Sequence, residues 1–429
     1  MAKFTEIPVS HYTGLPNIGV PLYEIDFEGL KIPIGMSYHA RGIKVEEIAS
    51  RTGIGWALNA GGLITRQIRG KNDFVGTHSY LNVDYYKDFE TDFSVRSRVY
   101  NLDIPGNGGD LLPDLFTFNF LGYSGKFIFD QQTKQPVLQS YDDLKIEKKG
   151  GNLEQDVYFV ITTKDGFKFY FGNTSDPNDT RRKAKSRDVA TGEFLLNSTA
   201  GLSDTTSNSS LNFTSSWHLM DIVSPNGNKL SFTYEEEVTN FYRRAYDFKK
   251  DGKQNSSFSA YRGHQYQLKE IVFDHGKVKF IKDNNEREDL KGGHALSSVE
   301  VYNTYKRVKK YNFKYSYSYN NSSNNINYYL YANAIHARKR LFLDDIELIG
   351  NNNDTELYRA FEYTNKNGLP NRFSNAQDYW GYYNGKNNGP FLASYNYENY
   401  QVSRAVDVAK ANIGLINKVI YPTGGYTSY

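Results

Sequence analysis

Residues 115–129 hold the pattern that decides the fold, and they read Leu115-Phe116-Thr117-Phe118-Asn119-Phe120-Leu121-Gly122-Tyr123-Ser124-Gly125-Lys126-Phe127-Ile128-Phe129. Phe116, Phe118 and Phe120 would share one face of a strand, because successive strand side chains point to opposite faces. Phe127 and Phe129 repeat that pattern after a turn at residues 122–125. The stretch therefore predicts a β-hairpin with one aromatic face buried.

The same period of two recurs along the chain. It is found at Phe167, Phe169 and Phe171, and again at Tyr311, Phe313, Tyr315, Tyr317 and Tyr319. No stretch of similar length has the 3.6-residue period of an amphipathic helix. We therefore expect an all-β fold with few or no long helices.

Composition supports this fold class. The 429 residues include 36 Tyr, 27 Phe and 3 Trp, and aromatic rings suit the half-buried surface of a sheet. The 51 Lys and Arg nearly balance the 48 Asp and Glu, which argues against nucleic acid as the main partner. Cysteine is absent, which excludes disulfides and thiolate metal sites. No apolar run approaches the roughly 18 residues that a membrane-spanning helix needs.

Three segments share a strand–turn–strand pattern. They are residues 222–234 with Pro225 and Gly227, residues 271–280 with Gly276, and residues 419–429 with Pro422 and Gly424. Glycine suits the reversing position because a positive φ costs it little. One hairpin cannot bury its own face, whereas several side by side can. We therefore expect stacked, Tyr-rich antiparallel hairpins that form an extended, curved sheet.

Changes in composition suggest three regions, at residues 1–70, 71–215 and 216–429. Residues 173–215 are rich in Asn, Ser and Thr and contain a basic run at 181–187, so they predict a polar surface insertion. Residues 241–265 predict a second insertion. The chain ends at Tyr429 just after a turn signal, where a strand would begin, and we expect it to continue in a longer polypeptide.

The sequence contains no recognisable catalytic, cofactor-binding or metal-binding motif. There is no Gly-x-Ser-x-Gly elbow, no phosphate-binding loop, and no pair of His residues with zincin spacing. Residues 283–287 lack the glycine of a calcium loop and favour a charged turn. The carboxylate pairs Asp344-Asp345 and Glu46-Glu47 are neighbours that would point to opposite faces of a strand. Residues 305–311 mix basic and aromatic side chains but favour a strand with a solvated face.

Two groups of motifs are informative beyond the alternation. In the first part of the chain they are Ile7–Gly14, Pro16–Ile18, Val20–Tyr23, Ser37–Ala40, Gly42–Val45, Gly53–Gly62 and Ile64–Arg66. Later ones are Asp114–Phe120, Gly122–Phe127, Arg340–Leu343, Gln377–Gly385 and Tyr421–Gly425. Together these motifs resemble the secreted RHS/YD-repeat proteins of Bacteroidetes and the N-terminal domain of the SpvB and toxin-complex B-component family. The chain departs from the pattern at Arg51, where the family predicts Trp, and at Arg41, where it predicts a small residue.

The resemblance implies a large protein whose strands spiral into a hollow shell, which often encloses a variable C-terminal toxin or effector. This chain would be a non-catalytic N-terminal wall or plug, secreted or held at the cell surface. Its partners would be the downstream part of the same polypeptide and the secretion machinery. Type 9 export is implied, with the export signal upstream of this sequence.

Eleven residues are interpreted as structural motif positions without chemistry of their own. In the Gly/Trp element, residues 53–62, they are Gly53, Gly55, Trp56, Leu58, Asn59, Gly61 and Gly62; at the hairpin turns they are Pro225, Gly227, Pro422 and Gly424. Trp56 would be a bulky anchor with backbone packed closely around it. Two alternatives stay open: an adhesin or carbohydrate-binding module that presents aromatic side chains to surface glycans, and, less favoured, a glycan-active enzyme.

Overall fold

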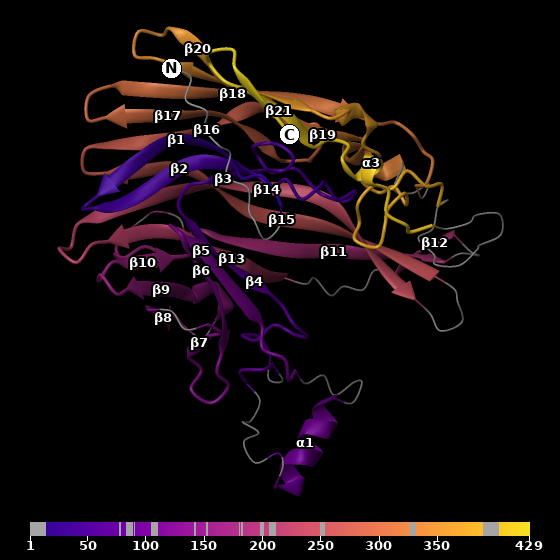
Figure 1. Cartoon of the computed structure of the whole chain (residues 1–429). Helices are drawn as coiled ribbons and strands as arrows, with labels where there is room; N and C mark the ends of the chain where they lie inside the picture. The colour runs from indigo at the N-terminus through magenta and orange to yellow at the C-terminus, as the bar shows by residue number, and fades with distance from the viewer. Residues whose placement is uncertain are drawn as a thin grey trace.

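The computed structural model describes residues 14–76, 79–82, 89, 91–103, 110–140, 143–151, 153–179, 181, 183–197, 201–205, 212–248, 254–326, 332–388 and 403–429. Residues 7–13 of the motif Ile7–Gly14 lie outside these ranges. Within them the regular secondary structure is almost entirely antiparallel strand, which confirms the all-β prediction (Figure 1). The longest described helix is α1 (Phe93–Asp103), which lies apart from the sheets.

The strands divide into a small and a large sheet. The small sheet contains β1 (Ile18–Phe27), β2 (Leu30–Tyr38) and β3 (Trp56–Asn59). The N-terminal part of the large sheet contains β4 (Gly62–Gln67), β5 (Leu115–Phe120), β6 (Tyr123–Phe129), β7 (Pro136–Leu138), β8 (Leu144–Lys149), β9 (Tyr158–Thr163), β10 (Lys168–Phe171), β11 (Lys185–Asn197) and β12 (Gly201–Thr205).

The large sheet continues with β13 (Asn212–Val223), β14 (Lys229–Phe248), β15 (Gln254–Phe273), β16 (Gly276–Glu286), β17 (His294–Asn303), β18 (Arg307–Tyr319), β19 (Lys339–Ile349), β20 (Thr355–Tyr363), β21 (Ile416–Ile420) and β22 (Tyr426–Ser428). Short helices are η1 (Glu154–Asp156), η2 (Ile335–Arg338), η3 (Lys366–Gly368) and α3 (Val408–Ala411).

Strand order follows the chain over the second half of the molecule. Each strand from β13 to β22 pairs antiparallel with the next one. This is the continuous, hairpin-built sheet that the repeated strand–turn–strand pattern predicted. β13 is a branch point, because it also pairs with β4, β10 and β11. Residues 216–218 of β13 pair with β4, whereas residues 221–223 pair with β14, so β4 and β14 diverge from there.

The aromatic hairpin at 115–129 forms β5 and β6. Phe116, Phe118 and Phe120 are at most 1% exposed, as the alternation predicted. The reversal occurs at Leu121 and Gly122, which have φ angles of 45° and 88°, and not over residues 122–125. A two-residue turn with positive φ at both positions matches the right-handed twist of the paired strands. Burial of each Phe side chain contributes about 2 to 3 kcal/mol.

The Tyr-rich stretch at 311–319 forms β18, but its alternation is interrupted. A bulge between Lys314 and Tyr315 shifts the register against β19. Tyr311 and Phe313 are buried as predicted, whereas Tyr319 is 52% exposed. The extra residue is Asp344 of β19, because Lys314 pairs with Asp345 and Tyr315 pairs with Leu343. A bulge in the partner strand cannot be anticipated from the alternation within residues 311–319 alone.

The three repeated turns are hairpins, and their glycines are required for two different reasons, a positive φ angle or close packing of a neighbouring strand. Gly227 and Gly424 have φ angles of 86° and 81°, as the turn interpretation requires. Gly276 is different, because it begins β16 without a positive φ. A Cβ there would lie 2.2 Å from the Tyr302 carbonyl oxygen, so close packing of β17 requires the glycine.

Two expected surface insertions contain strands. The described part of 173–215 includes β11, β12 and the start of β13. The described residues of the second range, 241–248 and 254–265, belong to β14 and β15, which are 20 residues each. The basic run also differs from a solvated loop: Arg181 forms ion pairs with Asp179 and Asp221, and the buried Lys185 amine donates to the Gln155 carbonyl. Polar composition misleads here because β14 and β15 pair along nearly their whole length and satisfy their own backbone groups.

The small sheet lies against the large one and shares its core. Figure 1 shows β1 and β2 crossing the long strands of the large sheet. A bulge in β1 between Pro21 and Tyr23 leaves the carbonyls of Pro21 and Leu22 facing the large sheet. Tyr358 donates to the Pro21 carbonyl and Tyr311 to the Leu22 carbonyl, each at 2.6 Å. One hydrophobic cluster runs through both sheets, from Ile18 to Val419.

Candidate functional site

The Gly/Trp element, residues 53–62, is held where the two sheets meet. Trp56 is 2% exposed, packs against Tyr38 and Phe361, and donates from Nε1 to the Tyr363 hydroxyl at 3.0 Å. Tyr363 in turn donates to the Leu343 carbonyl at 2.6 Å. Trp56 therefore connects β3 to β19 and β20, which agrees with its interpretation as an anchor.

The glycines of the element allow close approach. Gly55 has φ 74°, and a Cβ there would lie 2.5 Å from the Tyr38 ring. Gly53 has φ 105° and approaches the Leu343 amide, and a Cβ at Gly62 would lie 2.4 Å from the Cβ of Phe120. Gly61 has φ 92° beside Phe232. Each position thus has a steric reason for glycine.

The remaining motif residues are spread over the molecule. Leu58 packs against the shared core, and Asn59 is exposed and donates to Ser37 Oγ. Pro225 and Gly227 lie at the exposed β13–β14 turn, where the neighbouring Asn226 contacts Glu28 of the β1–β2 turn. Pro422 and Gly424 lie at the exposed β21–β22 turn. Of the predicted motif positions, the structure therefore brings together only those of the Gly/Trp element, and the turn residues lie elsewhere.

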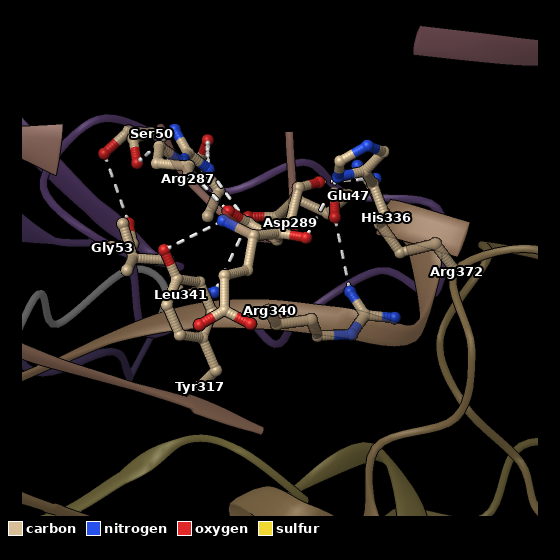
Figure 2. Close-up of polar contacts among 12 residues, drawn as sticks. Glu47, Ser50, Gly53, Arg287, Asp289, Tyr317, His336, Arg340, Leu341 and Arg372 are labelled. Atoms are coloured by element: carbon tan, nitrogen blue, oxygen red, sulfur yellow. Dashed lines mark hydrogen bonds and ion pairs between the residues drawn. The ribbon is translucent and has the colours of Figure 1, made fainter. Parts of the chain in front are cut away.

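Buried arginines tie the segment before the Gly/Trp element to the large sheet. Arg287 forms an ion pair with Asp289 at 2.9 Å and donates to the carbonyls of Ala49 and Ser50 (Figure 2). Arg340 donates to the carbonyls of Val45, Glu47 and Pro370. Burial lowers the pKa of the Arg340 guanidinium to about 9, so it stays charged at neutral pH.

The Gly/Trp element also lines a cavity of about 1020 Å³. The cavity lies where β4 and β14 diverge from β13, and strand divergence leaves unfilled space between their side chains. Residues 48–52 and 57–62 line one part of it, and residues of β4, β5, β13, β14 and β15, with Pro33, Arg287 and Leu290, line other parts. The sequence pattern does not reveal this cavity, because its lining comes from segments far apart in the chain, from Pro33 to Leu290.

The carboxylates that sequence analysis considered for glycan hydrolysis do not converge. Glu46 pairs with Arg244, whereas Glu47 accepts from the Lys44 amide and burial raises its pKa. Asp344 accepts from Lys366 and Ser316, and neighbouring Asp345 lies near Lys314. None of the four lines the cavity.

One acidic cluster was not anticipated. Asp73 and Asp114 are fully buried beside Arg66, which donates to Asp114 and to Glu154. Burial and the neighbouring Asp114 raise the pKa of Asp73 to about 7. These residues do not line the cavity either, and no group of three or more His, Asp or Glu among the described residues could hold a metal ion.

Residues 283–286 extend β16 and do not form the expected charged turn. Across the described ranges, no helix has both the length and the apolar composition needed to cross a membrane.

No protein-family model matches the chain, and neither does any curated protein. Among solved structures, the chain is similar to TcdB2–TccC3, with 11% identity and a TM-score of 0.43 over 85% of this chain. It is also similar to the Tc holotoxin pore of Photorhabdus luminescens (12%, TM-score 0.39, 82% of this chain).

A third similar structure is the N-terminal domain of the effector protein SpvB from Salmonella typhimurium, with 13% identity and a TM-score of 0.38. That match covers 79% of this chain and 99% of the SpvB domain. The chain spans 17% of the length of TcdB2–TccC3 and 16% of the Tc holotoxin chain.

Proposed function

We propose that this chain is a non-catalytic wall segment of a large secreted RHS-type protein, and that its β1–β3 sheet is a plug seated on the wall. The observation that carries this proposal is the joint between the two sheets. β1 is held by tyrosine hydroxyls from β18 and β20, and residues 45–50 are held by the buried Arg287 and Arg340. These contacts fix backbone segments of the small sheet against the large one.

The continuity of the sheet also supports a wall. From β13 to β22 each strand pairs with its neighbour in the chain, and β14 and β15 are 20 residues long, against a usual strand length of about 5 to 6. Such a surface is large and built of simple hairpins. On this proposal the wall surrounds a C-terminal toxin or effector in the same polypeptide, and type 9 secretion exports it.

The first test is the mass and shape of the native polypeptide. An antibody against this chain should detect a species far above 49.1 kDa in the producing cells and their medium. Negative-stain electron microscopy of the captured protein should show hollow particles. A secreted species near 49.1 kDa without a shell would contradict the proposal and favour a stand-alone adhesin.

A second test addresses the absence of catalysis. The purified chain should release no reducing sugar from a panel of plant, algal and bacterial polysaccharides. Turnover that disappears on substitution of one Asp or Glu would contradict the non-catalytic assignment.

A further inference from the structure

The β13–β14 turn holds an asparagine followed by a glycine at the surface. Pro225, Asn226 and Gly227 are all exposed. The turn is closed by the Ser224 amide, which donates to the Asn228 carbonyl, and by the Gly227 amide, which donates to the Ser224 carbonyl. Gly227 has a φ angle of 86°, and nothing lies within 4 Å of the position that a Cβ would take. No side chain therefore shields the Gly227 nitrogen from the Asn226 side chain.

An asparagine in this setting loses its side-chain amide without an enzyme. The Gly227 nitrogen gives its proton to water or hydroxide and attacks Cγ of Asn226, so that an N–Cγ bond forms. The Cγ–Nδ2 bond then breaks, and the nitrogen takes up a proton and leaves as ammonia. Water opens the resulting succinimide ring at either carbonyl and leaves an aspartate or an isoaspartate at position 226. The net reaction consumes water, releases ammonia and needs no oxidant or cofactor.

Two other Asn-Gly pairs in the described ranges are better protected. Asn384, which precedes Gly385, is buried, and its Nδ2 donates to two backbone carbonyls at 2.9 and 3.1 Å. Asn367 is exposed, but the Asn365 side chain covers the following Gly368, with Nδ2 2.6 Å from the position of an added Cβ. The hydrogen bonds at Asn226 are exposed to water and open more readily than those of a buried loop.

Asn226 is also part of a contact between the two sheets. Its Nδ2 donates to Glu28 Oε2 at 3.1 Å, and the Asn228 Nδ2 donates to Glu28 Oε1. Hydrogen bonds from Asn228, Ser224 and Asn226 lower the pKa of the Glu28 carboxyl, so it is ionised at neutral pH. Deamidation would replace one of these donors with a second negative charge beside Glu28, and the two carboxylates would repel each other.

We infer that Asn226 is a deamidation site, and that its conversion to aspartate or isoaspartate irreversibly releases the β1–β2 turn from the β13–β14 turn. Because the reaction needs only water, it is a slow chemical clock acting on one contact between the small and the large sheet. The rest of the small sheet stays in place, since Ile25 and Ile34 belong to the common core. The inference does not rest on the wall function, because it uses only the contact between these two turns.

Peptide mapping by mass spectrometry tests the site on the folded 429-residue chain. Deamidation adds about 1 Da, and the isoaspartate product separates as an isomeric peptide. Over weeks at about pH 8 we expect Asn226 to convert at least about tenfold faster than Asn384, and more slowly at about pH 5, because attack needs a deprotonated nitrogen. Conversion at Asn226 no faster than at Asn384 would overturn the site. A synthetic peptide of residues 222–230 then shows whether the fold or the local sequence suppresses the reaction.

Variants test the release of the turn by hydrogen-exchange mass spectrometry. At neutral pH, peptides that span residues 24–31 should exchange several-fold faster in Asn226→Asp than in wild type, and the difference should vanish below about pH 4, where the carboxylates take up protons. Aged wild type should approach Asn226→Asp, whereas aged Asn226→Gln should not change, because glutamine does not form the five-membered ring. The control is Asn387→Asp, which adds the same charge at an exposed position in another loop. Equal exchange in Asn226→Asp and Asn387→Asp would overturn the release of the turn.

Discussion

At the scale of single residues, the glycines of the Gly/Trp element make the sharpest prediction. Gly55→Ala combines a positive φ with a Cβ 2.5 Å from the Tyr38 ring, so it should destabilise the chain by about 2 to 4 kcal/mol. Gly76 is the matched control, because its φ is 94° and nothing lies within 4 Å of the added Cβ. Gly76→Ala should cost only about 1 kcal/mol. Urea denaturation measures both, and equal losses would show that packing around Gly55 is loose.

Asp73 makes a prediction about pH. Its pKa is raised to about 7 in the folded chain by burial and by Asp114, against 3.8 for an ordinary aspartate. The folded state therefore holds the proton more tightly than the unfolded state, and this stabilisation is complete below about pH 4 and lost as pH rises to about 7. We expect Asp73→Asn to remove that downward slope and to be more stable than wild type at pH 8.

The control for Asp73 is Asp130, whose pKa is lowered by hydrogen bonds from the Thr133 amide and hydroxyl. Its contribution is lost only as pH falls below about 4. Asp130→Asn should therefore keep the wild-type slope between pH 4 and pH 7 in thermal melts. A slope that also survives in Asp73→Asn would disprove the assignment to Asp73.

At the scale of elements, the bulge in β1 and the tyrosines of β18 and β20 act together. The bulge leaves the Leu22 carbonyl outside the β1–β2 ladder, and Tyr311 is the donor that satisfies it. Burial raises the pKa of Tyr311 to about 12, so the hydroxyl keeps its proton. Tyr311→Phe should cost about 1 to 2 kcal/mol and speed amide exchange in β1, because a buried acceptor loses its partner.

Tyr305 supplies the control for that substitution, since it is 92% exposed at the turn before β18. Tyr305→Phe should change neither the free energy of unfolding nor exchange in β1 by a measurable amount. If both variants behaved alike, the hydrogen bond from Tyr311 to the Leu22 carbonyl would make no measurable contribution to the free energy of unfolding.

The elements also show what sequence could and could not predict. The alternation of Phe residues at 116–120 predicted a strand correctly, because an apolar period of two is compatible only with a strand that buries one face. The bulge at Asp344 of β19, opposite Lys314 and Tyr315, and the strands within 241–248 and 254–265 were missed. Both depend on pairing with a partner strand, which local composition does not encode.

The cavity could not be predicted either, because it forms only where segments far apart in the sequence come together. Arg51 attracted notice only as a departure from a family pattern, and its contacts are to Gln267 and Leu268, more than 200 residues away. The steric part of the Gly/Trp element could be predicted, since glycines and a tryptophan in close succession indicate tight packing. That the Gly/Trp element also lines a cavity could not be predicted, because the cavity depends on how β4 and β14 diverge in the folded sheet.

At the scale of the whole molecule, the shared core decides whether the small sheet is a separate unit. Ile25 and Ile34 of the small sheet belong to the same buried cluster as Phe159 and Phe171 of the large one. A sheet of three strands has little apolar surface to bury by itself. The β1–β3 sheet therefore depends on the large sheet for its stability.

This dependence predicts a single cooperative unit, which hydrogen-exchange mass spectrometry can test on the unmodified chain. Peptides from β1 and β2 should become exposed at the same urea concentration as peptides from β9 and β10, because loss of either sheet uncovers the common core. Helix α1 is an internal reference: Phe93 and Tyr100 are 77% and 71% exposed, so its amides should exchange first and independently of urea. Earlier exposure of β1 and β2 than of β9 and β10 would mean that the small sheet can detach while the large sheet stays folded.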